Sequence, residues 1–172
     1  DIAVIMRQCL KAVFHCHACG IVHRDIKPEN FVFSDRDSSV KLVDLGVATR
    51  CASEESLSDT IGTPDYMAPE VVLTHVGYGC AADVWSLGVV LWILLTGRML
   101  LPEDEDEHRK ALADPSWVLD MMDLTPCLRR RSTSAAAIDL LKSMLQHNPK
   151  DRITVGAALQ HPFIVAHQFD QL

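Results

Sequence analysis

The chain has 172 residues, of which 48% are hydrophobic and 23% charged, and its formal net charge is −7 at neutral pH. This length indicates one domain, and the composition excludes an intrinsically disordered chain. The negative charge argues against a nucleic-acid-binding or anionic-membrane-binding surface, so neither partner is expected. The chain has no initiator Met, which leads us to expect a piece of a longer protein.

A helix is predicted over residues 2–19, because hydrophobic residues recur there at steps of three and four, with Gly20 as its C-cap. Cys16 and Cys19 form a C-x-x-C pair. No second ligand pair follows at zinc spacing, and a helix C-terminus disfavours a thiolate. We interpret the six cysteines as ordinary thiols of a reduced, intracellular protein, with a cytoplasmic location expected.

A short extended stretch at residues 21–22 leads into a polar motif at residues 23–30, HRDIKPEN. Asp25 is a candidate proton acceptor for an attacking hydroxyl, and Lys27 a candidate cation for a transferred anionic group. Asn30 offers a neutral oxygen suited to Mg²⁺. Hydroxyl, phosphate and metal together indicate phosphoryl transfer. A polar turn between a helix and a hairpin is the alternative interpretation.

Two strands are predicted at residues 31–33 and 40–43, joined by a polar run into a β-hairpin. The far end of this hairpin delivers the tripeptide Asp44-Leu45-Gly46. The hairpin would return Asp44 to the side of Asn30, so a carboxylate and an amide converge as a candidate Mg²⁺ site.

Beyond the hairpin, residues 47–61 are polar and predict a mobile loop. The apolar segment 83–97 predicts a buried core helix ending at Gly97, because it is shorter than the roughly 20 residues that span a bilayer. No membrane span is therefore expected.

The last third of the chain predicts further helices. The acidic run 103–107 is interpreted as a solvated helix start. The basic run 129–132 precedes a helix predicted at 134–145, with Ser132 or Ser134 as its N-cap. A final short helix is predicted at 154–160.

These motifs together resemble the C-terminal lobe of a eukaryotic Ser/Thr protein kinase, over nearly the whole chain as one domain, 1–172. Residues 23–30 resemble the catalytic loop and residues 44–46 the metal-binding D-F-G. Residues 62–70, GTPDYMAPE, resemble the end of the activation segment. Segments 83–88, 151–152 and 161–163 resemble later elements of the lobe. The resemblance implies a mainly α fold with a small β-hairpin.

The same resemblance implies ATP-dependent phosphoryl transfer to Ser or Thr of protein substrates, with ATP and Mg²⁺ as cofactors. The implied catalytic residues are Asp25, Lys27 and Asn30. The implied cofactor-binding residues are Lys27, Glu29, Asn30, Val32 and Asp44, of which Asn30 and Asp44 hold the metal. Val32 is expected as the floor of the adenine pocket, and Glu29 is expected to attract a basic residue of the substrate.

An activation segment is implied by Arg24, Asp59, Thr60 and Thr63. Within it, Asp59 is expected to replace an activating phosphothreonine and to bind Arg24, with Thr60 as the competing phosphorylation site.

Three structural residues follow from the resemblance. Glu70 and Arg152 are expected to form a buried ion pair. Asp83 is expected to bind the backbone of the catalytic loop, or to cap its own helix, or both.

Two features depart from the family pattern. Leu45 replaces the usual Phe, so its apolar stack with His23 is expected to be looser. No glycine-rich loop, strand lysine or helix glutamate appears, so the N-terminal lobe is a missing partner and the isolated chain is expected to be inactive. A pseudokinase or scaffold lobe is the alternative. Within the family, residues 28–33 and Asp59 most resemble the calcium/calmodulin-dependent and calcium-dependent kinases.

Overall fold

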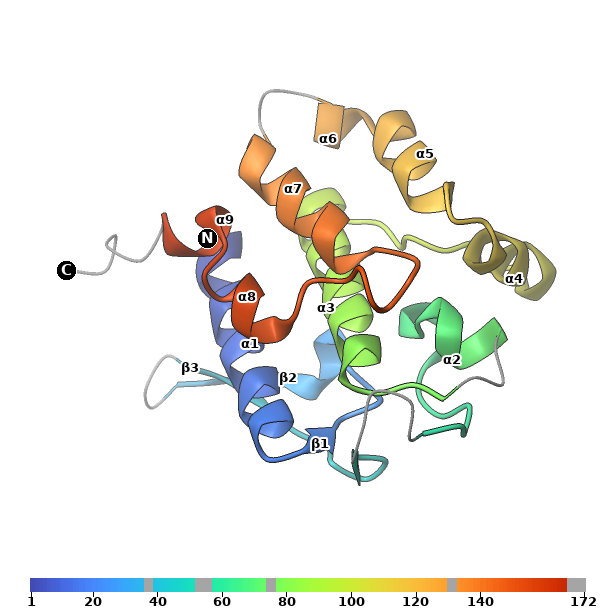
Figure 1. Ribbon diagram of the computed structural model, residues 1–172. Coiled ribbons are helices and arrows are strands. Elements are labelled where there is room, and N and C mark those ends of the chain that lie inside the picture. Colours follow the sequence, from blue (N-terminus) through green and yellow to red (C-terminus); the bar gives the residue numbers. More distant parts are fainter. Residues whose placement is uncertain (36–38, 52–56, 74–76, 130–132, 167–172) are drawn as a thin grey trace.

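The computed structural model describes residues 1–35, 39–51, 57–73, 77–129 and 133–166. Figure 1 shows a mainly helical chain gathered around one central helix, α3, with strands beside the lower half of α1. In the described part of the chain the strands form two separate two-stranded sheets. A mainly α fold with a small β-hairpin is therefore confirmed.

Helix α1 spans Ile2–Ala18 and is capped by Asp1, whose carboxylate accepts a hydrogen bond from the Ala3 amide. The face that carries Met6, Leu10 and Val13 is fully buried, as the three- and four-residue spacing predicts. The C-cap residue is Cys19 rather than Gly20. Gly20 follows in the left-handed region at φ +69°, where glycine is favoured.

Strands β2 (Phe31–Ser34) and β3 (Ser39–Leu42) form the predicted antiparallel hairpin, with Phe31 opposite Leu42. The second sheet was not predicted: β1 (Ile21–Val22) pairs with β4 (Thr49–Arg50). The mobile-loop prediction for residues 47–61 is thus wrong at its start, because β4 has the edge of β1 available for pairing. Residues 52–56 of that prediction lie outside the described residues.

Helix α3 spans Cys80–Thr96 and ends at Gly97, as predicted. Every residue from 82 to 92 is buried, so the helix packs on all sides. It begins before Asp83, with Gly79 as N-cap. A Cβ at Gly88 would lie 2.7 Å from Leu145 Cδ2, so the absence of a side chain allows this close approach.

The other helices surround α3 (Figure 1). Helix α7 carries the Ser134 cap that the sequence predicts, whereas Ser132 lies outside the described residues. Asp104 caps α4, so the acidic run does begin a helix. Helices α2, α5, α6 and α9 were not predicted from the sequence. The bounds are α2 Pro69–Leu73, α4 Glu105–Ala113, α5 Trp117–Leu124, α6 Pro126–Arg129, α7 Ala135–Met144, α8 Val155–Ala158 and α9 Pro162–Val165.

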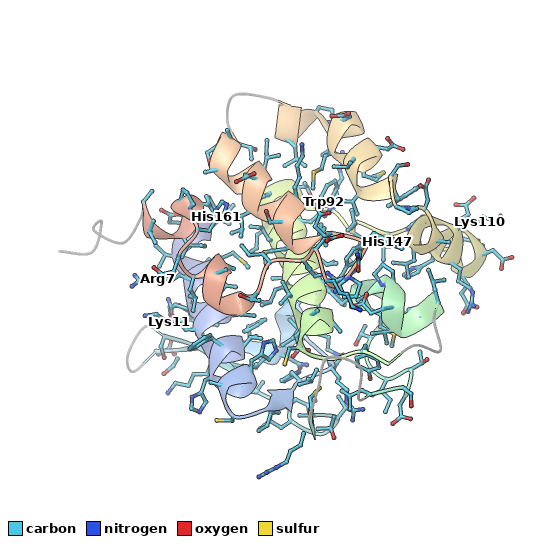
Figure 2. The ribbon with its side chains drawn as sticks, in the orientation of Figure 1. Arg7, Lys11, Trp92, Lys110, His147 and His161 are labelled. Atoms are coloured by element: carbon cyan, nitrogen blue, oxygen red, sulfur yellow. The ribbon has the colours of Figure 1, made fainter. Side chains whose placement is uncertain are left out.

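The core lies between α1, α3 and α7. Trp92 of α3 is 1% exposed and lies in the middle of the molecule in Figure 2, whereas Lys110 of α4 lies at the outer edge. None of the described helices is both long enough and apolar enough to cross a membrane.

Candidate active site

The carboxylate of Asp25 is the centre of a hydrogen-bonded cluster. Its Oδ2 lies 2.8 Å from Lys27 Nζ and accepts a hydrogen bond of 3.1 Å from Asn30 Nδ2. Its Oδ1 accepts two hydrogen bonds from Thr63, at 2.6 Å from the hydroxyl and 3.0 Å from the amide. Lys27 Nζ also donates to Thr63 Oγ1 at 2.8 Å. The three residues expected to be catalytic are therefore adjacent, together with Thr63.

These donors hold Asp25 in its charged form. Burial alone would raise the pKa of Asp25, but the hydrogen bonds from Lys27, Thr63 and Asn30 outweigh it and leave the pKa below its usual range. The pKa of Lys27 is raised, chiefly by its hydrogen bond to Asp25. At neutral pH the cluster therefore contains a carboxylate and an ammonium group.

We expect the Asp25–Lys27 contact to stabilise the fold equally across neutral pH and to weaken at both extremes. The lowered pKa of Asp25 gives a contribution that is present above its unfolded pKa of about 3.9 and lost as pH falls through the folded value. The raised pKa of Lys27 gives a stabilising contribution that is fully present below its unfolded pKa of about 10.4. This contribution is lost as pH rises through the pKa of Lys27 in the folded protein. Urea unfolding of wild type and Asp25→Asn should therefore differ by a constant amount from about pH 5 to about pH 9. A difference that changes steadily inside that window would contradict this assignment.

Asp83 fixes the backbone of the segment that contains Asp25. It is 1% exposed, and its two carboxylate oxygens accept the amide hydrogens of His23 and Arg24, each at 2.9 Å. Arg24 has φ +69°, a conformation that is costly for a residue with a side chain. The expected tie between Asp83 and the loop is present. The N-cap alternative is wrong, because the helix begins one turn earlier.

Asn30 and Asp44 lie at the open end of the hairpin. The Asn30 carbonyl accepts a hydrogen bond of 2.9 Å from the amide of Val43, the residue before Asp44. The Asn30 amide nitrogen donates to Asp25, so the side-chain oxygen of Asn30 remains as a ligand atom. Asp44 is exposed, and one of its oxygens accepts a hydrogen bond from Gly46. One carboxylate and one amide oxygen fit the donor preference of Mg²⁺.

The segment that contains Gly62 lies against the loop at residues 23–30. A Cβ at Gly62 would collide with the Arg24 carbonyl oxygen, and φ is +125°. Arg24 and Asp59 approach to 4.0 Å through one guanidinium nitrogen, so the expected contact is long and not bidentate. Asp59 is 73% exposed, and Thr60 donates its hydroxyl to the Val71 carbonyl at 3.2 Å.

Glu70 and Arg152 form the expected buried ion pair. Two guanidinium nitrogens lie 2.7 and 3.0 Å from the two Glu70 oxygens. Arg152 also donates to the carbonyls of Gln146, Ala81 and His147, and its guanidinium lies 5.2 Å from the centre of a Trp85 ring. The pair joins α2 to the segment before α8.

Three residues at the expected nucleotide side are exposed. Val32 is 48% exposed and Leu45 is 59% exposed, and Glu29 is also exposed. Leu45 therefore does not make a buried stack with His23, which is fully buried and pairs its Nε2 with the Val43 carbonyl at 3.2 Å.

Cys16 of the C-x-x-C pair has no sign of thiol activation. Burial raises the pKa of Cys16, and the nearby charge of Asp83 adds to this effect. Burial raises the pKa of Cys9 to about 12. No disulfide joins the cysteines of the described residues, and no group of metal-binding side chains occurs in the same part of the chain.

The role of His17 was not predicted from the sequence. Its Nε2 lies 2.9 Å from Asp83 Oδ2, which adds a third contact to the carboxylate that fixes the loop. The signal was available, since His17 stands four residues after Val13 and so on the buried face of α1.

Comparison with known proteins identifies the family. A family model described as a protein kinase domain matches residues 1–164. The chain belongs to the protein kinase family. It is 40% identical over 169 residues to calcium/calmodulin-dependent serine/threonine-protein kinase 1 of Oryza sativa subsp. japonica and to calcium-dependent protein kinase 12 of Arabidopsis thaliana. It is 38% identical over 169 residues to CDPK-related kinase 5 of Arabidopsis thaliana.

These matches cover 95% or 96% of this kinase chain but only 26% to 33% of the relatives. The chain thus spans about a quarter to a third of their length. The resemblance to the calcium/calmodulin-dependent and calcium-dependent kinases is confirmed.

Proposed function

We propose that this chain is the C-terminal lobe of a Ser/Thr protein kinase, one domain over residues 1–172, and that it transfers phosphate to protein hydroxyls when joined to an N-terminal lobe. The observation that supports this most is the cluster in which Lys27, Asn30 and Thr63 all donate to Asp25. Its residue types match a proton acceptor, a cation and a metal ligand for phosphoryl transfer.

In this proposal, Asp25 orients the Ser or Thr hydroxyl of the substrate and accepts its proton as the new oxygen–phosphorus bond forms. Lys27 neutralises charge on the transferred group. Four protein donors already contact the Asp25 carboxylate. The incoming hydroxyl therefore has to displace one of them.

Asn30 and Asp44 would hold Mg²⁺, and Val32 would contact the adenine of ATP. The metal would supply charge neutralisation of the phosphates when it is bound. The exposure of Val32 and Leu45 is consistent with surfaces that a second lobe and a nucleotide cover.

We further propose an intracellular, cytoplasmic enzyme whose substrates carry basic residues near the phosphorylated position. Glu29 is exposed on the same loop as Asp25 and is available to attract such a residue. The lack of a disulfide among the described cysteines is compatible with a reducing compartment.

A pseudokinase or scaffold lobe is the second candidate, because Leu45 replaces the usual Phe and is largely exposed. The two candidates differ in what the full-length protein does with ATP. A scaffold would bind partners through this lobe and transfer no phosphate, whereas an enzyme needs a glycine-rich loop and a strand lysine upstream of Asp1.

We expect the 172-residue chain alone to transfer no measurable phosphate, and the full-length protein to phosphorylate a basic Ser/Thr peptide. One lobe holds the nucleotide from one side only, so the orientation of the triphosphate is lost. Radiolabelled ATP with both proteins measures this directly. Transfer by the short chain that disappears in Asp25→Asn would show that one lobe suffices. An inactive full-length protein that retains partner binding would favour the scaffold.

Asp59 is proposed to order the activation segment through Arg24. Because the contact is 4.0 Å and exposed, Asp59→Asn should lower the activity of the full-length protein only several-fold, or about 1 kcal/mol at most. Thr60→Ala should have a mild effect. The measurement is kcat/KM, with limited proteolysis of the segment as a second readout. If Thr60→Ala abolished activity while Asp59→Asn left activity unchanged, the activation segment would be controlled by a phosphate on Thr60 instead.

A further inference from the structure

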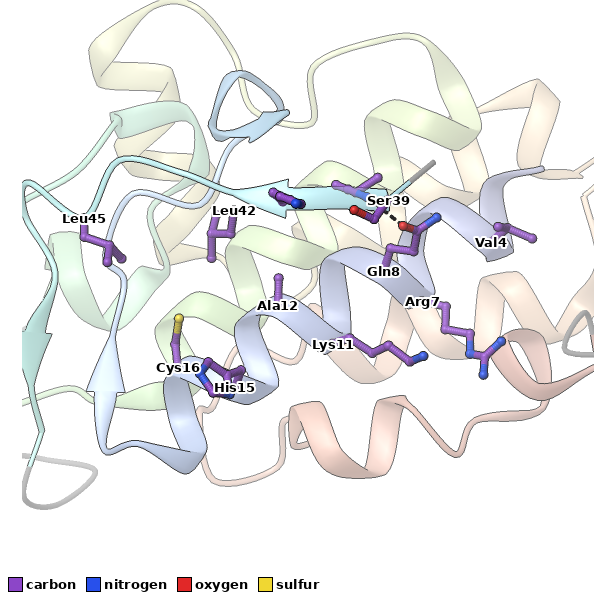
Figure 3. A pocket seen from close by; sticks show the side chains of 12 residues that line it. Val4, Arg7, Gln8, Lys11, Ala12, His15, Cys16, Ser39, Leu42 and Leu45 are labelled. Atoms are coloured by element: carbon purple, nitrogen blue, oxygen red, sulfur yellow. Dashed lines mark hydrogen bonds between the residues drawn. The ribbon is translucent and has the colours of Figure 1, made fainter. Parts of the chain in front are cut away.

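A small cavity of about 10 Å³ lies between α3 and the segment 57–63, and Arg24, Tyr78 and Asp83 are among the residues that line it. It differs from the groove of about 730 Å³ between α1 and β3, shown in Figure 3, which ends at Leu45 on the face that a second lobe would cover. The small cavity leaves room for no more than about one water molecule. The polar groups around it therefore rely on one another for hydrogen bonds.

Tyr78 is attached to the segment 57–63 through both its backbone and its side chain. Its backbone forms an antiparallel bridge with Leu57, with N–O distances of 3.2 and 2.7 Å. Its hydroxyl donates to the Asp59 carbonyl at 2.8 Å. Tyr78 is 3% exposed and directly precedes Gly79, the N-cap of α3. The segment is therefore fastened to the start of the most deeply buried helix.

The hydroxyl of Tyr78 also contacts Arg24. Burial raises the pKa of Tyr78, and the hydrogen bond from Arg24 offsets this only in part, so the hydroxyl stays protonated at neutral pH and can donate to Asp59. Arg24 in turn donates its Nε to the Val47 carbonyl at 2.6 Å. The phenol and the guanidinium therefore connect Val47 and Asp59 through the interior of the protein.

The carboxylate of Asp59 holds the segment less firmly than the hydroxyl of Tyr78 does. This carboxylate is 73% exposed and lies 4.0 Å from Arg24, so water and salt screen the attraction. The bond from Tyr78 to the Asp59 carbonyl is shorter and comes from a buried side chain. Its loss would leave a backbone carbonyl without its donor, which is the costlier change.

We propose that Tyr78 is a positioning residue for phosphoryl transfer, because its buried hydroxyl, bound between the Asp59 carbonyl and Arg24, keeps the segment 57–63 in place. The effect reaches Asp25 through Thr63, at the end of this segment, whose hydroxyl and amide both donate to the Asp25 carboxylate. This role rests on the proposed kinase function. It makes the order of the segment depend mainly on an internal hydrogen bond rather than on a charge at the surface.

The test is Tyr78→Phe in the full-length protein, because this change removes the hydroxyl and leaves the buried ring. The kcat/KM for a basic Ser/Thr peptide should fall about tenfold, as expected for a carbonyl that loses its donor. The fall should come mainly from a higher KM for the peptide, since the loosened segment adjoins the place where the substrate hydroxyl arrives. The KM for ATP should not change. Hydrogen exchange measured by mass spectrometry should become faster in residues 57–63.

Thr125→Val is the matched control. Thr125 is also buried, and its hydroxyl donates to a backbone carbonyl, that of Met121, at 2.6 Å. Its removal should lower the resistance to urea to a similar extent, but leave the peptide KM and the exchange of residues 57–63 unchanged. The proposal is overturned if Thr125→Val produces the same changes as Tyr78→Phe. It is also overturned if Tyr78→Phe lowers only kcat, as a smaller folded fraction would.

Hydrogen exchange separates the role of Tyr78 from the kinase function, because it can be measured without phosphoryl transfer. An active wild-type protein with unchanged exchange in Tyr78→Phe would overturn the role of Tyr78 and leave the kinase function standing. A wild-type protein that transfers no phosphate would overturn the kinase function, and with it the positioning role, even if exchange were faster in Tyr78→Phe.

Discussion

Replacing Asp25 with Asn in the full-length protein is expected to lower kcat for peptide phosphorylation by about 10²- to 10⁴-fold. The amide keeps the shape of the side chain but cannot accept a proton from a hydroxyl at neutral pH. It also removes the negative charge that Lys27 contacts at 2.8 Å. Steady-state kinetics with a basic Ser/Thr peptide measures the effect, and circular dichroism checks that the fold is retained.

The matched control is Asp123→Asn, which makes the same change at an exposed position of α5. It should leave kcat unchanged. If Asp25→Asn retained more than half of the wild-type kcat while Asp123→Asn behaved like wild type, the proposed proton acceptor would be wrong.

Breaking the Glu70–Arg152 pair is expected to have the largest effect on stability. Removing one partner leaves a buried charge without its counterion, at a cost of about 3–5 kcal/mol in the free energy of unfolding. Arg152→Ala should cost more than Glu70→Ala, because the arginine also serves three backbone carbonyls and contacts Trp85. Urea unfolding followed by tryptophan fluorescence measures both losses.

The double variant Glu70→Ala/Arg152→Ala should lose much less than the sum of the single losses, since each variant removes the same contact. Asp139→Ala is a useful comparison. Its carboxylate lies 3.1 Å from His161 Nε2 but is 73% exposed, so its removal should cost at most about 1 kcal/mol. Additive losses in the double variant would mean that the pair contributes no coupling energy.

Local patterns in the sequence predicted the hairpin, the core helix and the grouping of Asp25, Lys27 and Asn30, because each depends on residues close together in the chain. The contact of Thr63 with Asp25, 38 residues apart, was not predicted. Contacts between residues far apart in the chain were harder to predict. Glu70 and Arg152 are 82 residues apart, and only the resemblance to a known family paired them. The contact of His17 with Asp83, 66 residues away, was missed altogether.

The predicted boundaries of helices and strands were wrong where no side chain marks the start or end of the element. Helix α3 begins after Gly79, which offers no capping side chain, so the sequence predicted its start at the first acidic residue instead. Strand β4 has only two residues and exists because β1 presents an edge to it. Such short elements depend on tertiary pairing rather than on local propensity.

The carboxylate of Asp83 links the order of the loop that contains Asp25 to the stability of the core. Two consecutive loop amides, those of His23 and Arg24, donate to a side chain of the most deeply buried helix. These amides can exchange their hydrogens with solvent only when that contact opens, which requires the end of α3 to separate from the loop. Hydrogen exchange at His23 and Arg24 should therefore be as slow as in α3. The loop and the core then behave as one cooperative unit, and the left-handed backbone of Arg24 is maintained for as long as the core stays folded.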